Sequence, residues 1–161
     1  MDSIEKIFGG KIRIRVCGLC FNKNKLLLVR HNMNGQPFYA PPGGAVEFGE
    51  SITDTLVREF KEETCLNIVP GNLLFTTEFI RAPLHAIEMF FSLKSWNGSP
   101  CKGDDPELSS QNFIEEVSFF SISDINRFPK SQLHHILHNC NNLRKLLELS
   151  GFVHPPGNLN K

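Results

Sequence analysis

The sequence predicts a single domain of the α/β (α+β) class, in which a mixed β-sheet is packed between helices. Five stretches of alternating or aliphatic residues favour strands, at 11–21, 26–30, 73–79, 87–96 and 113–122. Two further stretches repeat their apolar residues at helical spacing, at 52–64 and 131–150. A chain of 161 residues, with 40% hydrophobic and 21% charged residues, is long enough to bury one core.

The composition argues against several classes of partner. The 17 basic and 17 acidic side chains give a formal net charge of zero, so we expect neither a nucleic-acid partner nor a membrane-binding basic patch. No apolar run is long enough to span a bilayer, and the first residues lack the pattern of a signal peptide. The five cysteines are scattered, which favours reduced thiols and a cytoplasmic location. Cys17 and Cys20 have no second pair, so we expect no zinc site.

The first predicted element is a β-hairpin. Residues 11–21 alternate, and we expect the isoleucines of this stretch to be buried and Arg13 and Arg15 to face the other way. A polar turn at 22–25 leads into the strand at 26–30. The two arginines are either solvated charges or substrate-binding residues, because guanidinium groups match phosphate oxygens.

A glycine pair and a capped helix follow the hairpin. Two prolines disfavour helix just before Gly43 and Gly44, whose backbone can approach another group closely. Ser51 has the position of an N-cap for a helix at 52–64. We expect this helix to pack on the sheet through an apolar stripe of Ile52, Leu56 and Phe60.

The same helix carries three carboxylates on one side. Glu59, Glu62 and Glu63 have the spacing i, i+3, i+4, which brings their side chains together. Like-charged neighbours cost a few tenths of a kcal/mol per pair on an exposed helix, so solubility alone does not explain them. Mg²⁺ and Mn²⁺ prefer carboxylate oxygens and water as ligands. The pattern therefore indicates a site for a divalent cation.

The stretch from Gly44 to Leu66 resembles the signature box of the Nudix hydrolases. That box joins a glycine, a glutamate, an Arg-Glu pair, a Glu-Glu pair and a final apolar residue at fixed spacing. The sequence supplies Gly44, Glu50, Arg58, Glu59, Phe60, Glu62, Glu63 and Leu66 at these positions. Cys65 departs from the pattern, because the family usually has glycine there, at a helix end that often needs a left-handed conformation.

The resemblance implies a Nudix fold and a pyrophosphohydrolase that uses Mg²⁺ or Mn²⁺. We expect one domain over residues 1–161, with the box at 44–66 and a flexible tail at 152–161. By similarity, the metal ligands are Glu59, Glu62, Glu63 and the carbonyl of Gly43, and Gly44 lies beside the substrate. Arg58 is expected to face away from the metal and to orient Glu59 or Glu50, with Glu50 outside the set of direct ligands.

The resemblance leaves the general base open between two glutamates. By similarity with one branch of the family, Glu59 is a candidate for the general base. Glu116 lies where other members place a glutamate that reaches the metal or acts as the base, and Glu115 and Glu107 are further candidates. The alternative for the pair Glu115 and Glu116 is two exposed acids at the start of a strand.

The last part of the chain is expected to cover the second face of the sheet. A short helix at 124–128 precedes an amphipathic helix at 131–150, which we place opposite the helix at 52–64. His134 and His138 have a spacing that could hold a metal. Because His135 interrupts their face and no acidic partner is nearby, we do not expect a second metal site.

The expected substrate is a nucleotide or a nucleoside diphosphate derivative. ADP-ribose hydrolases of the family often have a proline at a set distance after the box, where this chain has Arg81, with Pro83 slightly later. The alternative function is a non-catalytic nucleotide-sensing or protein-binding module on the same fold. The complete set of three glutamates favours the enzyme, and the sequence leaves open whether the chain forms a homodimer.

Overall fold

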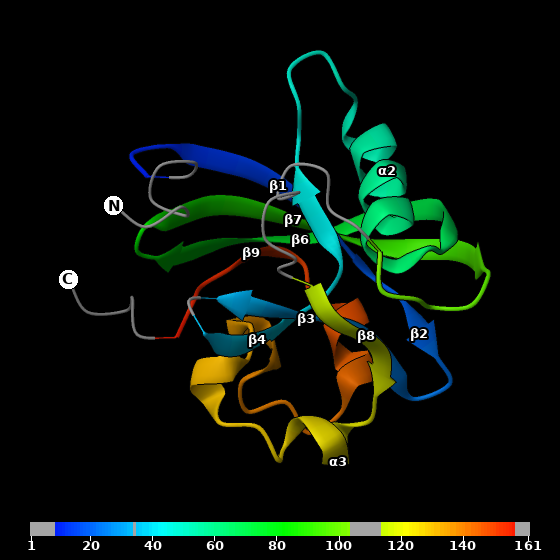
Figure 1. Ribbon diagram of the computed structural model, residues 1–161, viewed down its shortest axis with the longest axis vertical. Coiled ribbons are helices and arrows are strands. Elements are labelled where there is room, and N and C mark those ends of the chain that lie inside the picture. The colour runs from blue at the N-terminus through cyan, green and yellow to red at the C-terminus, as the bar shows by residue number, and fades with distance from the viewer. Residues whose placement is uncertain (1–8, 34, 104–113, 157–161) are drawn as a thin grey trace.

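The structure is a computed structural model that describes residues 9–33, 35–103 and 114–156. Its strands form two sheets, with the helix α2 (Ile52–Thr64) on one side of them and short helical turns on the other (Figure 1). These mixed sheets with few helices agree with the predicted α+β class. The chain crosses from the smaller sheet to the larger one between 40 and 43, just before the 44–66 stretch, and α2 packs on side chains of both sheets.

The five-stranded sheet has the order β5-β1-β7-β6-β9. Its central strands β1 and β7 are parallel, β6 and β7 form a long antiparallel pair, and β9 adds a parallel edge. The short strand β5 pairs antiparallel with β1. The strands are β1 (Ile12–Leu19), β5 (Gly43–Ala45), β6 (Asn67–Arg81), β7 (Leu84–Asn97) and β9 (Gly151–Val153).

The smaller sheet is centred on one strand and is entirely antiparallel. The central strand β3 pairs with β2, β4 and β8. The predicted hairpin at the turn 22–25 is confirmed only next to the turn, where β2 pairs with β3, because the rest of the first predicted strand, β1, belongs to the other sheet. The strands are β2 (Phe21–Asn22), β3 (Lys25–Met33), β4 (Gln36–Ala40) and β8 (Ile114–Phe120).

The helix α2 has the predicted bounds and packs where the apolar stripe predicts. The hydroxyl of Ser51 accepts a hydrogen bond from the amide of Asp54, as expected of the N-cap. Leu56 and Phe60 are fully buried against strands of both sheets. Cys65 closes the helix in the left-handed conformation, with φ of 64°, which the usual glycine would adopt more easily.

The predicted helix at 131–150 is wrong. This segment forms three short 3₁₀ helices, which follow the single turn α3 (Ile122–Ile125); they are η2 (Lys130–Gln132), η3 (His135–Leu137) and η4 (Leu143–Glu148). Its asparagines explain the interruption, because Asn139 has a positive φ of 56° and Asn142 caps η4. The apolar spacing still has its predicted effect, since Leu133, Leu143 and Leu146 are buried.

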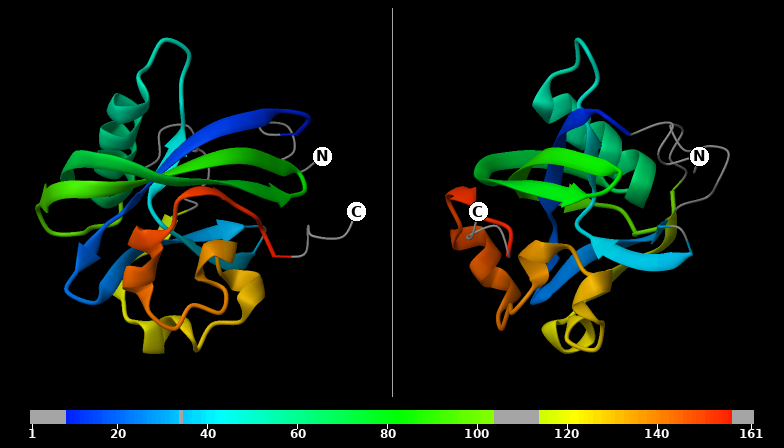
Figure 2. Two further views of the ribbon diagram at one scale, coloured as in Figure 1. Left: turned by 180° about the vertical axis from the view of Figure 1, so that it is seen from behind. Right: turned by 90° about the vertical axis from the view of Figure 1, so that its left-hand side faces the viewer.

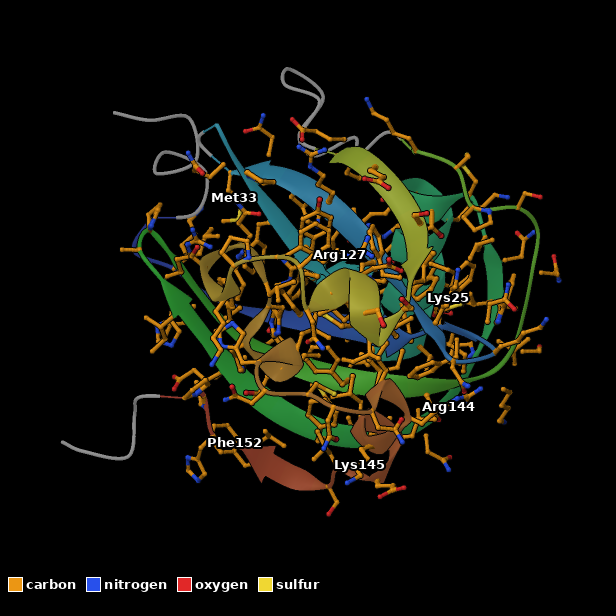
Figure 3. All side chains as sticks on the ribbon, turned by 90° about the horizontal axis from the view of Figure 1, so that it is seen from below. Lys25, Met33, Arg127, Arg144, Lys145 and Phe152 are labelled. Carbon is orange, nitrogen blue, oxygen red and sulfur yellow. A yellow bond between two sulfur atoms is a disulfide. The ribbon has the colours of Figure 1, made fainter. Side chains whose placement is uncertain are left out.

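The segment from α3 to η4 packs against the side of the sheets opposite α2 (Figure 2). Arg144 of η4 fastens this segment to the hairpin turn. Figure 3 labels its side chain on the ribbon of this segment. Its guanidinium donates to the carbonyl of Lys23 at 2.6 Å and lies 4.6 Å from the ring centre of Phe21. The first residues of the predicted tail, Phe152 and Val153, belong to β9, which pairs with β6.

The structure also corrects the predicted orientation of the first strand. Ile12 and Ile14 are exposed, at 66% and 54% of their surface, whereas Arg13 and Arg15 are half-buried. The two arginines lie on the face that looks toward the core between the sheets. The alternation is present, but its apolar face is the outer one at this end of β1.

Two of the five cysteines form a disulfide, which corrects the expectation of reduced thiols. Cys65, at the end of α2, is bonded to Cys101, with the Cα atoms 5.6 Å apart. Amides of the same loop donate to the last carbonyls of α2, Cys101 to Thr64 and Gly103 to Glu63. The C-terminal end of α2 is therefore fixed by a covalent bond and two hydrogen bonds.

Among the helices of the described segments, none has the length and apolarity needed to cross a bilayer.

Candidate active site

A guanidinium group surrounded by carboxylates occupies the side of α2 that the sequence singled out. Arg58 donates to both oxygens of Glu50, from Nε at 2.9 Å and from Nη2 at 3.0 Å. Its Nη1 donates to Glu59 at 2.9 Å and to Glu62 at 3.1 Å, and Glu47 lies 4.0 Å away. We call Arg58 and these four glutamates the Arg58 cluster.

The contacts of Arg58 agree with one expectation and correct another. Arg58 does hold Glu50 and Glu59, as the sequence predicted, but it lies among the acidic side chains rather than facing away from them. Hydrogen bonds from Arg58 and from the hydroxyl of Thr55 lower the pKa of Glu50 to about 2. Glu50 is thus a fixed, ionised partner of Arg58.

The glycine pair of β5 lies directly against the acidic helix. The amide of Gly43 donates to Oε2 of Glu63 at 3.0 Å. A Cβ atom at Gly44 would lie 2.1 Å from Oε1 of Glu59, so only glycine leaves room for that carboxylate. The pair therefore holds Glu59 and Glu63 against β5 through a close approach of the backbone, as expected of the two glycines.

The donor set fits a hard divalent cation. Four carboxylates meet one guanidinium in the Arg58 cluster, which leaves an excess of three negative charges, and Glu63 lies beside it. Carboxylate and carbonyl oxygens are the ligands that Mg²⁺ and Mn²⁺ prefer. Within the described residues, no three acidic, histidine or cysteine side chains already converge on one point. Their oxygens are instead turned toward Arg58 and the Gly43 amide.

A second charge cluster lies on the other side of β5. Arg15 donates from Nη2 to the carbonyl of Gly43 at 2.9 Å, and its Nε lies 3.6 Å from Oε1 of Glu88. The other carboxylate oxygen of Glu88 is 2.6 Å from Nε2 of His134. We call Arg15, Glu88 and His134 the Arg15 cluster. The position of Arg15 beside Gly43 explains why this predicted substrate-binding residue is not a solvated surface charge.

The buried members of the Arg15 cluster were missed by the sequence reasoning. Glu88 and His134 are 3% and 2% exposed, and they come from β7 and from the start of η3. Burial alone would raise the pKa of Glu88, but the hydrogen bond from His134 and the positive charge of Arg15 hold it at about 2. The available signal was an acidic residue next to the apolar run at 89–91, but no pattern near it identifies its partners.

The structure places the two candidates for the general base differently. Glu59 belongs to the Arg58 cluster and contacts Gly44. Glu116 lies opposite Arg30 in the β3–β8 pair, whereas its neighbour Val117 packs in the cluster beneath α2. Since successive side chains of a strand alternate, Glu116 points away from the α2 side of its sheet. Glu107 lies outside the described residues.

The remaining candidates have ordinary partners. Glu115 pairs with Arg30 at 3.1 Å and accepts from Asn32 at 2.8 Å. His138 is 2.9 Å from the carbonyl oxygen of Lys130, and with His134 held by Glu88 the two histidines do not share a ligand position. Phe38 and Phe90 belong to the core, at 6% and 0% exposed.

Comparison with known proteins shows which family the chain resembles. Residues 11–138 match the NUDIX domain family. The chain is 34% identical over 127 residues to a protein of Methanocaldococcus jannaschii named ADP-ribose pyrophosphatase, covering 76% of this chain and 68% of that one. It is 28% identical over 104 residues to the NAD-capped RNA hydrolase NudC of Vibrio atlanticus, a match that covers 65% of this chain but 38% of that relative.

Solved structures show the same fold. A MutT NUDIX hydrolase from Burkholderia pseudomallei superposes with a TM-score of 0.63 at 21% identity, covering 86% of this chain and 97% of that one. An ADP-ribose pyrophosphatase from Streptococcus suis gives a TM-score of 0.58 at 19% identity, covering 88% and 98%. The fold predicted from the sequence motif is thereby confirmed.

Proposed function

The chain belongs to the NUDIX domain family of hydrolases, and we propose that it is a divalent-metal-dependent enzyme that cleaves the diphosphate of a nucleoside diphosphate derivative. Hydrolysis of phosphoric anhydride bonds is the reaction of this enzyme class. We propose ADP-ribose as the first substrate to test, because the archaeal relative with that activity in its name matches most of the chain.

The observation that carries the proposal is the charge imbalance of the Arg58 cluster. Four carboxylates face one guanidinium at a position where α2 is partly open to solvent, with Arg58 24% and Glu62 25% exposed. Such an excess of negative charge is destabilising unless a further cation neutralises it. A diphosphate substrate is itself anionic, so it would bind here only together with that cation.

Each residue of the site has a proposed role. Glu59, Glu62, Glu63 and the carbonyl of Gly43 would hold Mg²⁺ or Mn²⁺, which when bound supplies Lewis acidity at the pyrophosphate oxygens. Arg58 orients Glu59 and Glu62 and is itself held by the ionised Glu50. Gly44 keeps the space for the Glu59 carboxylate and lets the substrate approach the backbone.

We favour Glu59 over Glu116 as the group that accepts the proton of the attacking water. A general base must lie within hydrogen-bond reach of that water, at about 3 Å. Glu59 belongs to the cluster that would bind the diphosphate, whereas Glu116 lies beside Arg30 on the other face of its sheet. Glu116→Gln should therefore change turnover much less than Glu59→Gln.

A screen of nucleoside diphosphate derivatives tests the proposal. ADP-ribose, NADH, dinucleoside polyphosphates and nucleoside triphosphates would each be incubated with Mg²⁺ or Mn²⁺, and the released nucleotide measured by chromatography. Glu62→Gln and Glu63→Gln should each lose most turnover while the fold is retained. Glu78→Gln is the matched control, because Glu78 pairs with His85 and not with a residue of the Arg58 cluster. Unchanged rates in both site variants would refute the metal assignment.

The alternative, a non-catalytic module that senses nucleotides, makes a different prediction in the same screen. Such a module should bind a nucleotide but release no product from any of the compounds, with or without metal.

We further propose that residues 1–161 act as one domain, since both sheets contribute to the cluster of buried side chains beneath α2.

A further inference from the structure

We infer that the Arg15 cluster is a positioning device for the metal site, in which buried Glu88 and His134 hold Arg15 so that its guanidinium fixes the carbonyl of Gly43. The inference rests on the proposed function, because Gly43 supplies a metal ligand only if that function is correct. Arg15, Glu88 and His134 would not touch the metal or the substrate.

The geometry of Gly43 is the first observation. Both polar groups of this residue are held by charged side chains from distant parts of the chain. Its amide donates to Glu63 at 3.0 Å, and its carbonyl accepts from Arg15 at 2.9 Å. A carbonyl oxygen has two lone pairs, so the bond to Arg15 sets the direction of the carbonyl and leaves one lone pair for an ion.

The burial of Glu88 is the second observation. A carboxylate that is 3% exposed is costly to keep ionised, and it needs a cation and hydrogen-bond donors around it. Replacing a buried ion pair with apolar side chains is often neutral or stabilising, so the pair is weak support for a role in stability alone. Arg15 of this pair donates a hydrogen bond to the Gly43 carbonyl. The pair can therefore position that carbonyl, which an apolar pair could not do.

The hydrogen bonds of His134 show how Glu88 is held. The Nδ1 atom of His134 accepts from the amide of Ile136 at 3.4 Å, which places the imidazole hydrogen on Nε2. That Nε2 donates to Glu88 at 2.6 Å, and the amide of His134 donates to the carbonyl of Tyr39. Glu88 is thus oriented by η3 and neutralised by Arg15, which reduces the repulsion between Arg15 and an ion at Gly43.

Binding of Mn²⁺ alone, followed by electron paramagnetic resonance on the full chain, tests the inference. Glu88→Gln keeps an acceptor for His134 but removes the charge that faces Arg15. The double variant Arg15→Met/Glu88→Gln removes both charges, so it leaves no unpaired buried ion to unfold the protein. We expect both variants to bind Mn²⁺ about tenfold more weakly, in the range seen when neighbours of metal ligands are changed. Glu78→Gln, the same exchange in the half-exposed Glu78–His85 pair, should bind Mn²⁺ as the wild type does.

A second measurement separates positioning from a general loss of structure. If the cluster positions the metal site, the activity of both variants should recover in part as the Mn²⁺ concentration is raised, because the defect lies in metal affinity. Circular dichroism shows which variants are folded, and the double variant decides the question if Glu88→Gln does not fold. Wild-type Mn²⁺ affinity in the folded double variant would overturn the inference.

Failure of the inference and failure of the proposed function give different results. If the wild type does not bind Mn²⁺, or if Glu62→Gln binds it equally well, the proposed metal site itself is wrong. If Glu62→Gln loses Mn²⁺ while Arg15→Met/Glu88→Gln binds it as the wild type does, the metal site stands and the Arg15 cluster has no positioning role.

Discussion

The Arg58 cluster and the Arg15 cluster flank the same short strand, β5, and use the same kinds of side chain in opposite ways. In the Arg58 cluster four carboxylates share one guanidinium near solvent, whereas in the Arg15 cluster one carboxylate, one guanidinium and one imidazole form a largely buried set. The net charge of each cluster therefore distinguishes a site that can bind a further ion from a set of side chains that only hold one another. An excess of charge leaves a place for a further ion, while a balanced set holds its own members in place.

The two glycines of β5 allow the clusters to be disturbed one at a time, with the largest expected effect. An alanine at Gly44 would meet the Glu59 carboxylate, the end of a flexible side chain that can move away. We expect Gly44→Ala to fold normally and to lose activity about 100-fold, because a small misplacement of a catalytic group has effects of that size. Steady-state kinetics and thermal unfolding measure the two quantities.

Gly43→Ala is the contrasting variant. Its Cβ would lie 2.0 Å from the carbonyl oxygen of Val16, which is backbone in a paired strand and cannot move away. This variant should lose stability, not only activity. Full activity in Gly44→Ala would show that Glu59 does not need its present position.

Removing the guanidinium of the Arg58 cluster should have the next largest effect. In the presence of EDTA, Arg58→Gln leaves Glu50, Glu59 and Glu62 facing one another without their shared cation. We expect the free energy of unfolding to fall by about 3 kcal/mol, near the lower end for a broken buried pair because Arg58 is partly exposed. Urea unfolding measures it, and Mn²⁺ should restore more stability to this variant than to the wild type.

Arg127→Gln is the control for that experiment. Arg127 is 79% exposed in its side chain and lies 4.0 Å from Asp124, so its pair is a surface ion pair of little consequence. If Arg58→Gln is as stable as Arg127→Gln in EDTA, the carboxylates of α2 do not repel one another strongly, and the charge imbalance argued above is not real.

The Arg58 cluster could be predicted from the sequence because its signals are local. The N-cap, the apolar stripe and the acidic spacing all lie within the stretch from Ser51 to Thr64, and helical geometry alone brings Glu59, Glu62 and Glu63 to one side. The bounds of α2 follow from these signals, whereas the contacts of Arg58 with Glu50 and Glu59 were expected from the family resemblance. The contact with Glu62 was not predicted, because it depends on the side-chain conformation of Arg58.

The Arg15 cluster could not be predicted because its members come together only in the folded chain. Arg15, Glu88 and His134 belong to β1, β7 and the start of η3, and no pattern in any one of these segments names the other two. The predicted helix at 131–150 had also placed His134 on a regular helix. His134 instead lies just before η3 with ψ of 137°, outside any helix, and from there its imidazole reaches Glu88.

The disulfide is a further difference between the two clusters, because it constrains the end of α2, the helix that carries the Arg58 cluster. Cys65 and Cys101 are 36 residues apart, and a cross-link of that span stabilises by about 2 to 3 kcal/mol in practice. We expect tris(2-carboxyethyl)phosphine to lower the free energy of unfolding by this amount, measured with urea. Cys65→Ser/Cys101→Ser should lose its response to the reductant, whereas Cys140→Ser, which changes a free thiol, should keep it. A titration that finds five free thiols in the unfolded, unreduced protein would exclude the bond.

The smallest expected effect is a dependence of stability on pH that comes from the Arg15 cluster. The pKa of Glu88 is lowered from 4.5 to about 2, so its ionised form stabilises the folded protein above pH 4.5. That contribution should be lost as the pH falls from 4.5 toward 2, because Glu88 then becomes protonated in the folded protein as well as in the unfolded protein. We expect Glu88→Gln to remove on the order of 1 to 2 kcal/mol of the pH dependence in this window. Urea unfolding at pH 5 and pH 3 measures it, with Glu78→Gln as the control for losing one carboxylate. If the wild type and Glu88→Gln lose stability in parallel, the charge of Glu88 is not held by Arg15 and His134, and the distinction between a balanced and an unbalanced cluster fails on its buried side.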